Sequence, residues 1–362
     1  MQRRKFIQGA AGAGIAATAL AAPAIVSAQP VIRWRMATSW PKSLDTLFGG
    51  AELVGQRVAA LTDGKFQIRA FAGGEVVPAL QVLDAVEKNT VECGHTANYY
   101  YIGRDLSMAF DTALPFGLTM RQQNSWMYYG GGLQLMRELF GKYNCTIFPA
   151  GNTGTQMGGW FRKEINSLAD VKGLKMRIPG VGGRIMAALG ATPQTLPAGE
   201  IYQALERGTI DAAEFVGPYD DEKLGFAKVA KLYYAPGWWE PSAQVSLIVN
   251  KGEFDKLPKP YQEALASACK EVNLDMVAEY DAKNAQALQR LIKTAGVQVK
   301  MFPDDVMRAA QKAAFDIYIE EAGKNPMFKK IYDSWKPFRD AQYSWLSVAD
   351  GAFDRFVYAN RI

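Results

Sequence analysis

The feature that most constrains the fold is a repeated alternation of short apolar strands with amphipathic helices. Residues 31–38 and 65–71 are predicted strands, and residues 46–61 between them carry apolar side chains at helical spacing. This order is a βαβ unit, and its recurrence predicts a mostly parallel sheet with helices on its faces. The next predicted elements are a helix over 78–88, a strand over 91–95, a helix over 121–140 and a strand over 145–150.

The same alternation returns later in the chain and predicts a second α/β lobe. A strand over 243–250 then leads back to the first lobe, so the chain crosses between lobes more than once. We expect lobe I to comprise 29–154 plus about 241–281, and lobe II to comprise 155–240 plus about 282–324. The predicted elements of lobe II are a strand over 175–178, a helix over 183–189, an extended segment over 192–196 and a helix over 199–207.

Two long helical segments follow. Residues 260–293 keep near-helical apolar spacing for roughly 50 Å, up to the stop signal Gly296, so this helix is long enough to brace both lobes. Residues 325–362 form a C-terminal helical extension that packs on its own domain or on a partner chain. Its aromatic residues are Trp335, Phe338, Tyr343, Trp345, Phe353 and Phe356.

The N-terminus has the pattern of an export signal. Arg3 and Arg4 precede a Gly/Ala-rich apolar run, and the small residues up to Ala28 suit a signal peptidase. We therefore expect residues 1–28 to be a signal peptide of the twin-arginine type, cleaved after Ala28. With no cysteine near this point, no lipid anchor is expected.

Charge and composition exclude several classes of function. Removing the three basic residues of the signal lowers the formal net charge from +5 to +2, which predicts no general affinity for nucleic acid or anionic membranes. His95 is the only histidine, so histidine-dependent hydrolysis is not expected, and we interpret it as a structural imidazole. The cysteines Cys93, Cys145 and Cys269 are too far apart for a zinc motif, and we expect no structural disulfide.

Several motifs together give the sequence a resemblance to a known family. Across its length the chain resembles the solute receptors of tripartite ATP-independent periplasmic (TRAP) transporters, and most closely their 2-keto-acid-binding branch. The resemblance is carried by residues 43–50, Tyr99–Tyr101, the loop 151–160, Arg177, Glu214, residues 217–223 and residues 236–240. The resemblance implies an α/β, two-lobed type II periplasmic-binding-protein fold, with a long bracing helix and a C-terminal helix that is exchanged in a homodimer.

The resemblance also implies a binding site and no catalytic residues. Arg177, near the end of a strand, would hold a ligand carboxylate through two parallel hydrogen bonds, as a planar guanidinium can. A sodium ion would be held by the side chains of Gln156 and Glu214 and the backbone carbonyl of Phe215, and Glu240 is a further candidate ligand. Without the resemblance, these acids would more often be solvated or would bridge the lobes.

Aromatic residues are candidates for the walls of the ligand pocket. They are Phe48, Tyr100, Trp160 and Trp239, each of which would suit the protein core equally well. The chain departs from the family pattern at Phe215, where relatives carry tryptophan, and at Asn98, where a smaller residue is expected. These departures affect the choice of ligand more than the cation.

We therefore expect a non-enzymatic periplasmic receptor that binds pyruvate or a larger 2-keto acid with sodium and delivers it to TRAP membrane subunits. One alternative keeps the family but binds lactate, pyroglutamate or another small monocarboxylate, with calcium or without metal. Two other classes stay open at this point: a twin-arginine-exported enzyme with an unrecognised cofactor site, and a purely structural protein.

Overall fold

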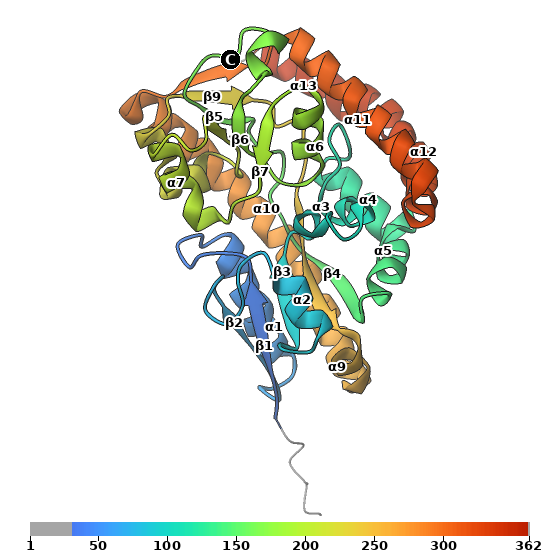
Figure 1. Cartoon of the computed structure of the whole chain (residues 1–362). Helices are drawn as coiled ribbons and strands as arrows, with labels where there is room; N and C mark the ends of the chain where they lie inside the picture. Colours follow the sequence, from blue (N-terminus) through green and yellow to red (C-terminus); the bar gives the residue numbers. More distant parts are fainter. Residues whose placement is uncertain (1–30, 361–362) are drawn as a thin grey trace, which may run out of the picture. The chain divides into compact units, whose positions relative to one another are not determined.

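The computed structural model describes residues 31–360, and the predicted signal peptide, residues 1–28, lies outside the described residues. The fold is built on two mixed β-sheets covered by helices, and the chain passes between them more than once (Figure 1). A two-lobed α/β fold was predicted from the sequence, and this architecture confirms it.

The first sheet is five-stranded, in the order β2-β1-β3-β10-β4. β1 runs parallel to β2 and β3, whereas β10 is antiparallel to both of its neighbours. β10 arrives from the second sheet and therefore enters the first sheet against the direction of β3. The strands are β1 (Ile32–Thr38), β2 (Phe66–Phe71), β3 (Cys93–Thr96), β4 (Cys145–Asn152) and β10 (Gln244–Asn250).

The second sheet is six-stranded, in the order β11-β9-β5-β8-β6-β7. Here β5 is antiparallel to β8 and β9, whereas the other five strands run in one direction, so the sheet is mostly parallel, as the sequence predicted. β5 follows directly after the chain leaves β4 and enters the sheet from the other end. The strands are β5 (Gly159–Phe161), β6 (Lys175–Arg177), β7 (Thr192–Gln194), β8 (Ala212–Ala213), β9 (Leu232–Ala235) and β11 (Gln298–Met301).

Helices cover both sheets (Figure 1). One expectation is corrected here: residues 121–140 form two helices rather than one, because the chain turns at Gly130 and Gly131, and Gly131 adopts a left-handed φ of 84°. The helices are α1 (Leu47–Leu61), α2 (Val82–Glu87), α3 (Ala109–Thr112), α4 (Met120–Tyr129), α5 (Gly132–Gly141), α6 (Gly180–Ala188), α7 (Ala198–Glu206), α8 (Pro218–Leu224), α9 (Lys251–Lys256), α10 (Lys259–Ala295), α11 (Asp304–Lys324), α12 (Pro326–Val348) and α13 (Asp350–Ala359), with 3-10 turns at Asn98–Tyr101, Leu106–Met108, Leu168–Val171 and Phe226–Lys228.

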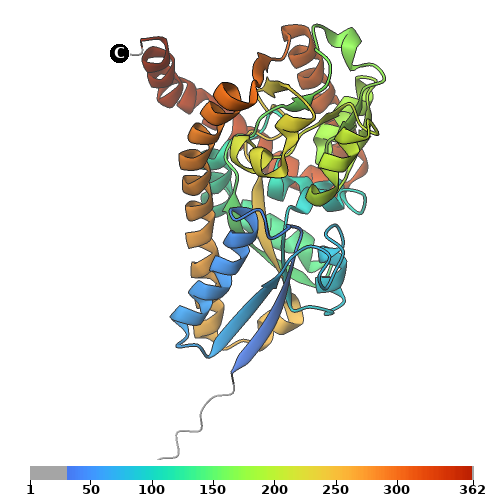
Figure 2. The same ribbon diagram turned by 90° about the vertical axis from the view of Figure 1, so that its left-hand side faces the viewer.

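The long helix α10 has 37 residues, which corresponds to about 55 Å. It ends at Gly296, whose left-handed φ of 67° forms the C-cap, as the sequence predicted. Figure 2 shows α10 running beside α1 of the first sheet and continuing to the second sheet. α10 therefore contacts elements of both halves of the molecule.

The C-terminal extension is helical, as predicted, and its two helices differ in burial. Trp335 and Phe328 of α12 pack against Phe110 in the core, whereas no residue of α13 is buried. Among the large apolar residues of this region, Trp345, Phe353 and Phe356 are 59–68% exposed. Within the described residues, no helix is both long and apolar enough to cross a membrane.

Candidate ligand-binding site

Arg177 anchors the site. It is the last residue of β6, after exposed Lys175 and buried Met176, and its side chain is 1% exposed. Nη1 donates to the backbone carbonyl of Glu214 over 2.7 Å and pairs with the carboxylate of the same residue, while Nε donates to Leu196 over 3.3 Å. A buried guanidinium needs acceptors for its donors, and the end of β8 supplies them.

Two buried carboxyl groups lie close to Arg177. Glu214 follows β8 and is fully buried, and Glu240, in the loop before β10, is 3% exposed. Burial raises the pKa of Glu214 to about 8, against the opposing effect of the Arg177 charge. Burial also raises the pKa of Glu240 well above its usual range, and the nearby charge of Glu214 adds to this effect. A single guanidinium thus faces two carboxyl groups, which favours entry of a further cation.

Gln156 brings an amide oxygen to the same place. Its backbone N–H donates to the carbonyl of Glu240 over 3.1 Å, and its carbonyl accepts from Gly237 over 3.0 Å. Its side-chain Nε2 donates to Thr153 Oγ1 over 3.1 Å, which fixes the orientation of the amide. The loop 151–160 and the loop 236–240 are therefore held together by backbone hydrogen bonds beside Arg177.

Buried polar atoms without a protein partner test whether these residues fit a cation. Around Arg177, three buried acceptors lack a hydrogen-bond donor: Gln156 Oε1, Glu214 Oε2 and Glu240 Oε2. An unsatisfied buried acceptor is costly, and hard cations prefer oxygen ligands of this kind. The indole N–H groups of Trp238 and Trp239 are also buried without an acceptor. The residues therefore fit a cation together with an oxygen-bearing anion.

A small cavity opens beside this cluster. Three predicted site residues, Tyr100, Gln156 and Phe215, line it, and the ring of Phe215 lies 5.5 Å from the guanidinium carbon of Arg177. The rest of the lining is mainly apolar. It consists of Trp40, Leu47, Ala97, Tyr99, Thr153, Val216, Ala243 and Val245, which sequence reasoning did not select.

Four predicted pocket residues lie elsewhere than on this cavity wall. Phe48 lies beside a separate groove on α1, while its neighbour Leu47 lines the cavity, because adjacent helical residues point about 100° apart. Trp160 stacks on Tyr233 with ring centroids 4.1 Å apart. Trp239 packs against Trp238 and Phe302 behind the carboxyl groups.

The fourth such residue, Asn98, belongs to a polar cluster on the first sheet. Its Nδ2 donates to Asp111 Oδ2 over 2.6 Å, and Gln244 and Ser246 donate to the other oxygen of Asp111. Burial raises the pKa of Asp111 to about 6. Asn98 therefore acts here as a partner of a buried carboxyl group.

His95 is held as a neutral imidazole. Its Nδ1 accepts from the indole of Trp40 over 2.8 Å, and Nε2 lies 3.0 Å from the carbonyl of Ala150. Burial lowers its pKa to about 4, so the ring carries no charge at neutral pH. The structural interpretation of His95 agrees with this geometry. The three cysteines are buried and unpaired, as expected.

Two α/β halves around a small cavity, with a buried arginine and no assembled catalytic group among the described residues, define the class of solute-binding receptors. Residues 36–324 match the model of the bacterial extracellular solute-binding protein family 7. The chain belongs to this family and is a receptor rather than an enzyme.

Relatives and solved structures agree with this family. The chain is 51% identical to the monocarboxylate 2-oxoacid-binding periplasmic protein of Nostoc sp., over the full length of both. It is 53% identical to a TRAP transporter solute-binding protein of Bordetella bronchiseptica, with a TM-score of 0.90 over 91% of this chain and 98% of that one; that crystal structure is a mixed-occupancy dimer with calcium and picolinate in one active site. A TRAP solute-binding protein of Pseudoalteromonas atlantica, with bound sodium and pyruvate, is 39% identical with a TM-score of 0.87 over 90% and 98% of the two chains.

Proposed function

We propose that this receptor binds a monocarboxylic 2-oxo acid together with a metal cation and presents it to TRAP membrane subunits in the periplasm. The observation that carries the proposal is the set of three buried acceptor oxygens, on Gln156, Glu214 and Glu240, that have no protein donor beside the buried guanidinium of Arg177. The sodium–pyruvate and calcium–picolinate complexes of similar proteins support both parts of the proposal.

Arg177 would hold the ligand carboxylate. Its hydrogen bonds within the described residues run from Nε and Nη1, which leaves Nη2 for the ligand. A 2-oxo acid carries its carboxylate and keto oxygens on adjacent carbons and can therefore meet this donor and a cation at once.

Gln156, Glu214 and the carbonyl of Phe215 would hold the cation, with Glu240 as a further ligand. The cation would balance the excess of buried negative charge and orient the ligand oxygens. With two carboxylates, one guanidinium and a monoanionic ligand, a divalent cation gives a neutral site if both glutamates are ionised. Sodium gives the same total charge if one of them is protonated.

The cavity wall indicates which ligand side chain would fit. Apart from Gln156 and Thr153 the lining residues are aliphatic or aromatic, and none of them offers a charge to a second carboxylate. We therefore propose aliphatic 2-oxo monocarboxylates, pyruvate or larger, over dicarboxylates.

The remaining parts of the proposal concern organisation. The lobe boundaries predicted from the sequence are supported by the sheets, because residues 32–152 and 244–250 supply the strands of the first and 159–235 and 298–301 those of the second. The export signal in residues 1–28 and the family support a periplasmic location. The exposed aromatic residues Phe353, Phe356 and Tyr358 support a homodimer contact through α13.

Isothermal titration of the mature protein tests the proposal. Pyruvate and longer 2-oxo acids should bind in sodium or calcium buffer, and Arg177→Ala should weaken binding by about a hundredfold or more, because it removes a buried charge-assisted contact. Arg308→Ala, at an exposed surface arginine, is the matched control and should leave binding unchanged. Equal binding by wild type and Arg177→Ala would contradict the proposal.

A further inference from the structure

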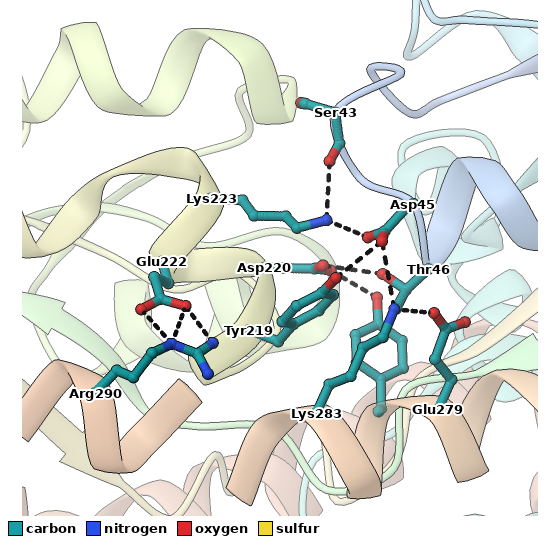
Figure 3. Close-up of polar contacts among 11 residues, drawn as sticks. Ser43, Asp45, Thr46, Tyr219, Asp220, Glu222, Lys223, Glu279, Lys283 and Arg290 are labelled. Atoms are coloured by element: carbon teal, nitrogen blue, oxygen red, sulfur yellow. Dashed lines mark hydrogen bonds and ion pairs between the residues drawn. The ribbon is translucent and has the colours of Figure 1, made fainter. Parts of the chain in front are cut away.

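Two sequence motifs that the ligand site does not use meet each other in the structure (Figure 3). Asp45 and Thr46 lie between β1 and α1 on the first sheet, and Tyr219, Asp220 and Lys223 lie on α8, which follows β8 of the second sheet. Residues 174 positions apart in the sequence are thus hydrogen-bonded partners across the two halves.

The inner layer of this contact is buried. Thr46 Oγ1 donates to Asp220 Oδ1 over 2.9 Å, and the hydroxyl of Tyr280 on α10 donates to Asp220 Oδ2 over 2.6 Å. All three residues are fully buried. Thr46 occupies the N-cap position of α1, where a threonine usually accepts a hydrogen bond from its own helix, yet its side chain makes no such bond. The hydroxyl instead links α1 to the second half of the molecule.

The outer layer is ionic and half-exposed. The carboxylate of Asp45 pairs with Lys223, accepts from the hydroxyl of Tyr219 over 2.8 Å and lies 3.3 Å from Lys283 Nζ. Both lysines also lie over the ring of Tyr219, at 4.4 and 4.7 Å from its centre. Figure 3 shows Asp45 enclosed between Lys223, Tyr219 and Lys283, so that one residue of the first half is held by α8 and α10 together.

This contact adjoins the ligand cavity without being part of it. Thr46 precedes Leu47, and α8 begins two residues after Val216; both Leu47 and Val216 line the cavity. A movement that separates the Leu47 wall from the Val216 wall would therefore act directly on the contact between Thr46 and Asp220.

We propose that Asp45, Thr46, Tyr219, Asp220, Lys223, Tyr280 and Lys283 form a closure latch that sets ligand affinity by stabilising the closed receptor. This inference rests on the proposed function, in which binding requires the two halves to close around the ligand. Since the latch touches no ligand, it changes the fraction of closed receptor and not the contacts within the site. Weakening the latch should lower the affinity for every ligand by the same factor.

The first arm of the test is calorimetry of Thr46→Val and Asp45→Asn with pyruvate and with a longer 2-oxo acid. If the receptor is mostly open without ligand, Thr46→Val should weaken the binding of both acids by about tenfold, since it leaves Asp220 Oδ1 without its buried donor. Asp45→Asn should weaken the binding of both acids by about two- to fivefold, because the ion pairs of Asp45 are half-exposed. The ratio between the two ligands should stay unchanged. Asp316→Asn, in an exposed ion pair with Lys312 on α11, is the control and should bind as wild type does.

The second arm observes closure directly by single-molecule energy transfer. Lys88→Cys and Lys163→Cys place labels on exposed sites of the two halves, and the native cysteines are buried and so are protected from labelling. Each latch variant should show fewer closed molecules at a given ligand concentration than the labelled wild type. Asp45 is half-exposed, so Asp45→Asn keeps the test informative if Thr46→Val does not fold.

The outcomes separate the latch from the proposed function. Unchanged affinities together with unchanged closed populations would overturn the latch, and so would a change in the ligand ratio, since that would place these residues in the ligand site. A wild type that binds no 2-oxo acid would instead overturn the proposed function. In that case the latch is tested by measuring the affinities of the variants for whichever small carboxylate the wild type binds, or their closed populations without ligand.

Discussion

Two pairs of buried acids, at least six residues apart in the sequence, differ in what surrounds them in this receptor. Asp220 and Asp221 on α8 and Glu214 and Glu240 beside the cavity are all at most 3% exposed, and burial raises the pKa of each. Burial and pKa therefore do not distinguish the two pairs. Their hydrogen-bond partners do.

Every side-chain oxygen of the α8 pair has a protein donor. Asp220 accepts from Thr46 and Tyr280, and Asp221 accepts from the indole of Trp160 over 2.9 Å and the hydroxyl of Tyr233 over 2.6 Å. The other oxygen of Asp221 accepts from the backbone N–H of Val216. By contrast, Glu214 and Glu240 each keep one oxygen without a donor. A buried carboxyl group with an unmet oxygen indicates a binding site, whereas a satisfied one indicates structure.

The largest effect that we expect from this comparison is on cation-dependent ligand binding. Glu214→Gln removes a negative charge from the proposed cation site and should weaken cation-dependent ligand binding by about a hundredfold. Calorimetry with pyruvate at several sodium and calcium concentrations measures this effect. Cation dependence that survives unchanged in Glu214→Gln would place the cation elsewhere.

Isosteric amide substitutions compare the stability of the two pairs. Asp221→Asn turns an acceptor into a donor facing Trp160 and Tyr233, and should lower the free energy of unfolding by about 2–3 kcal/mol. Glu240→Gln replaces a buried carboxyl group that has an unmet oxygen and whose raised pKa keeps it protonated, so the free energy of unfolding should change by less than about 1 kcal/mol. Denaturant unfolding of the ligand-free proteins gives both values. Equal losses in the two variants would remove the distinction between the pairs.

The pH dependence of ligand binding should be set by Glu214, one of the two acids beside the cavity. The pKa of Glu214 is raised to about 8 in the ligand-free protein, so cation binding must release a proton at neutral pH. Affinity should therefore fall as the pH drops, by roughly tenfold per unit below pH 8. Titrations in buffers of different ionisation enthalpy count the protons released. Proton uptake on binding would contradict an ionised Glu214 in the complex.

The smallest expected effect concerns the apolar wall. Leu47→Ala enlarges the cavity beside the ligand side chain, and should weaken binding of a longer aliphatic 2-oxo acid by about fivefold while changing pyruvate binding less. Competition between the two acids measures the ratio. A uniform loss for both acids would instead indicate that Leu47 acts through the adjacent latch residue Thr46.

The sequence predicted the parts of the fold that are long and periodic. The βαβ unit formed by β1, α1 and β2 and the helix α10 emerge at nearly their predicted bounds, because their apolar spacing extends over many residues. β5 and β8 have only three and two residues, too few for any periodicity, so the antiparallel centre of the second sheet was missed. The break at Gly130–Gly131 was missed because the apolar spacing continues across it.

The candidate site shows a similar division. The resemblance selected Gln156, Arg177 and Glu214, and the structure brings these residues together from three separate segments of the chain. Trp160 has the size and composition of a pocket aromatic, but its partners Tyr233 and Asp221 come from distant segments that no local pattern reveals. The same holds for Thr46, whose partner Asp220 is visible only in the fold.

The most direct test of the central claim is a crystal structure of the mature receptor grown with pyruvate and either sodium or calcium. The account predicts the ligand carboxylate on Arg177 and one cation in contact with Gln156 Oε1, a carboxylate oxygen of Glu214 and the ligand. A ligand bound away from Arg177, or a site in which the oxygens of Gln156 and Glu214 meet protein donors and no cation, would contradict it.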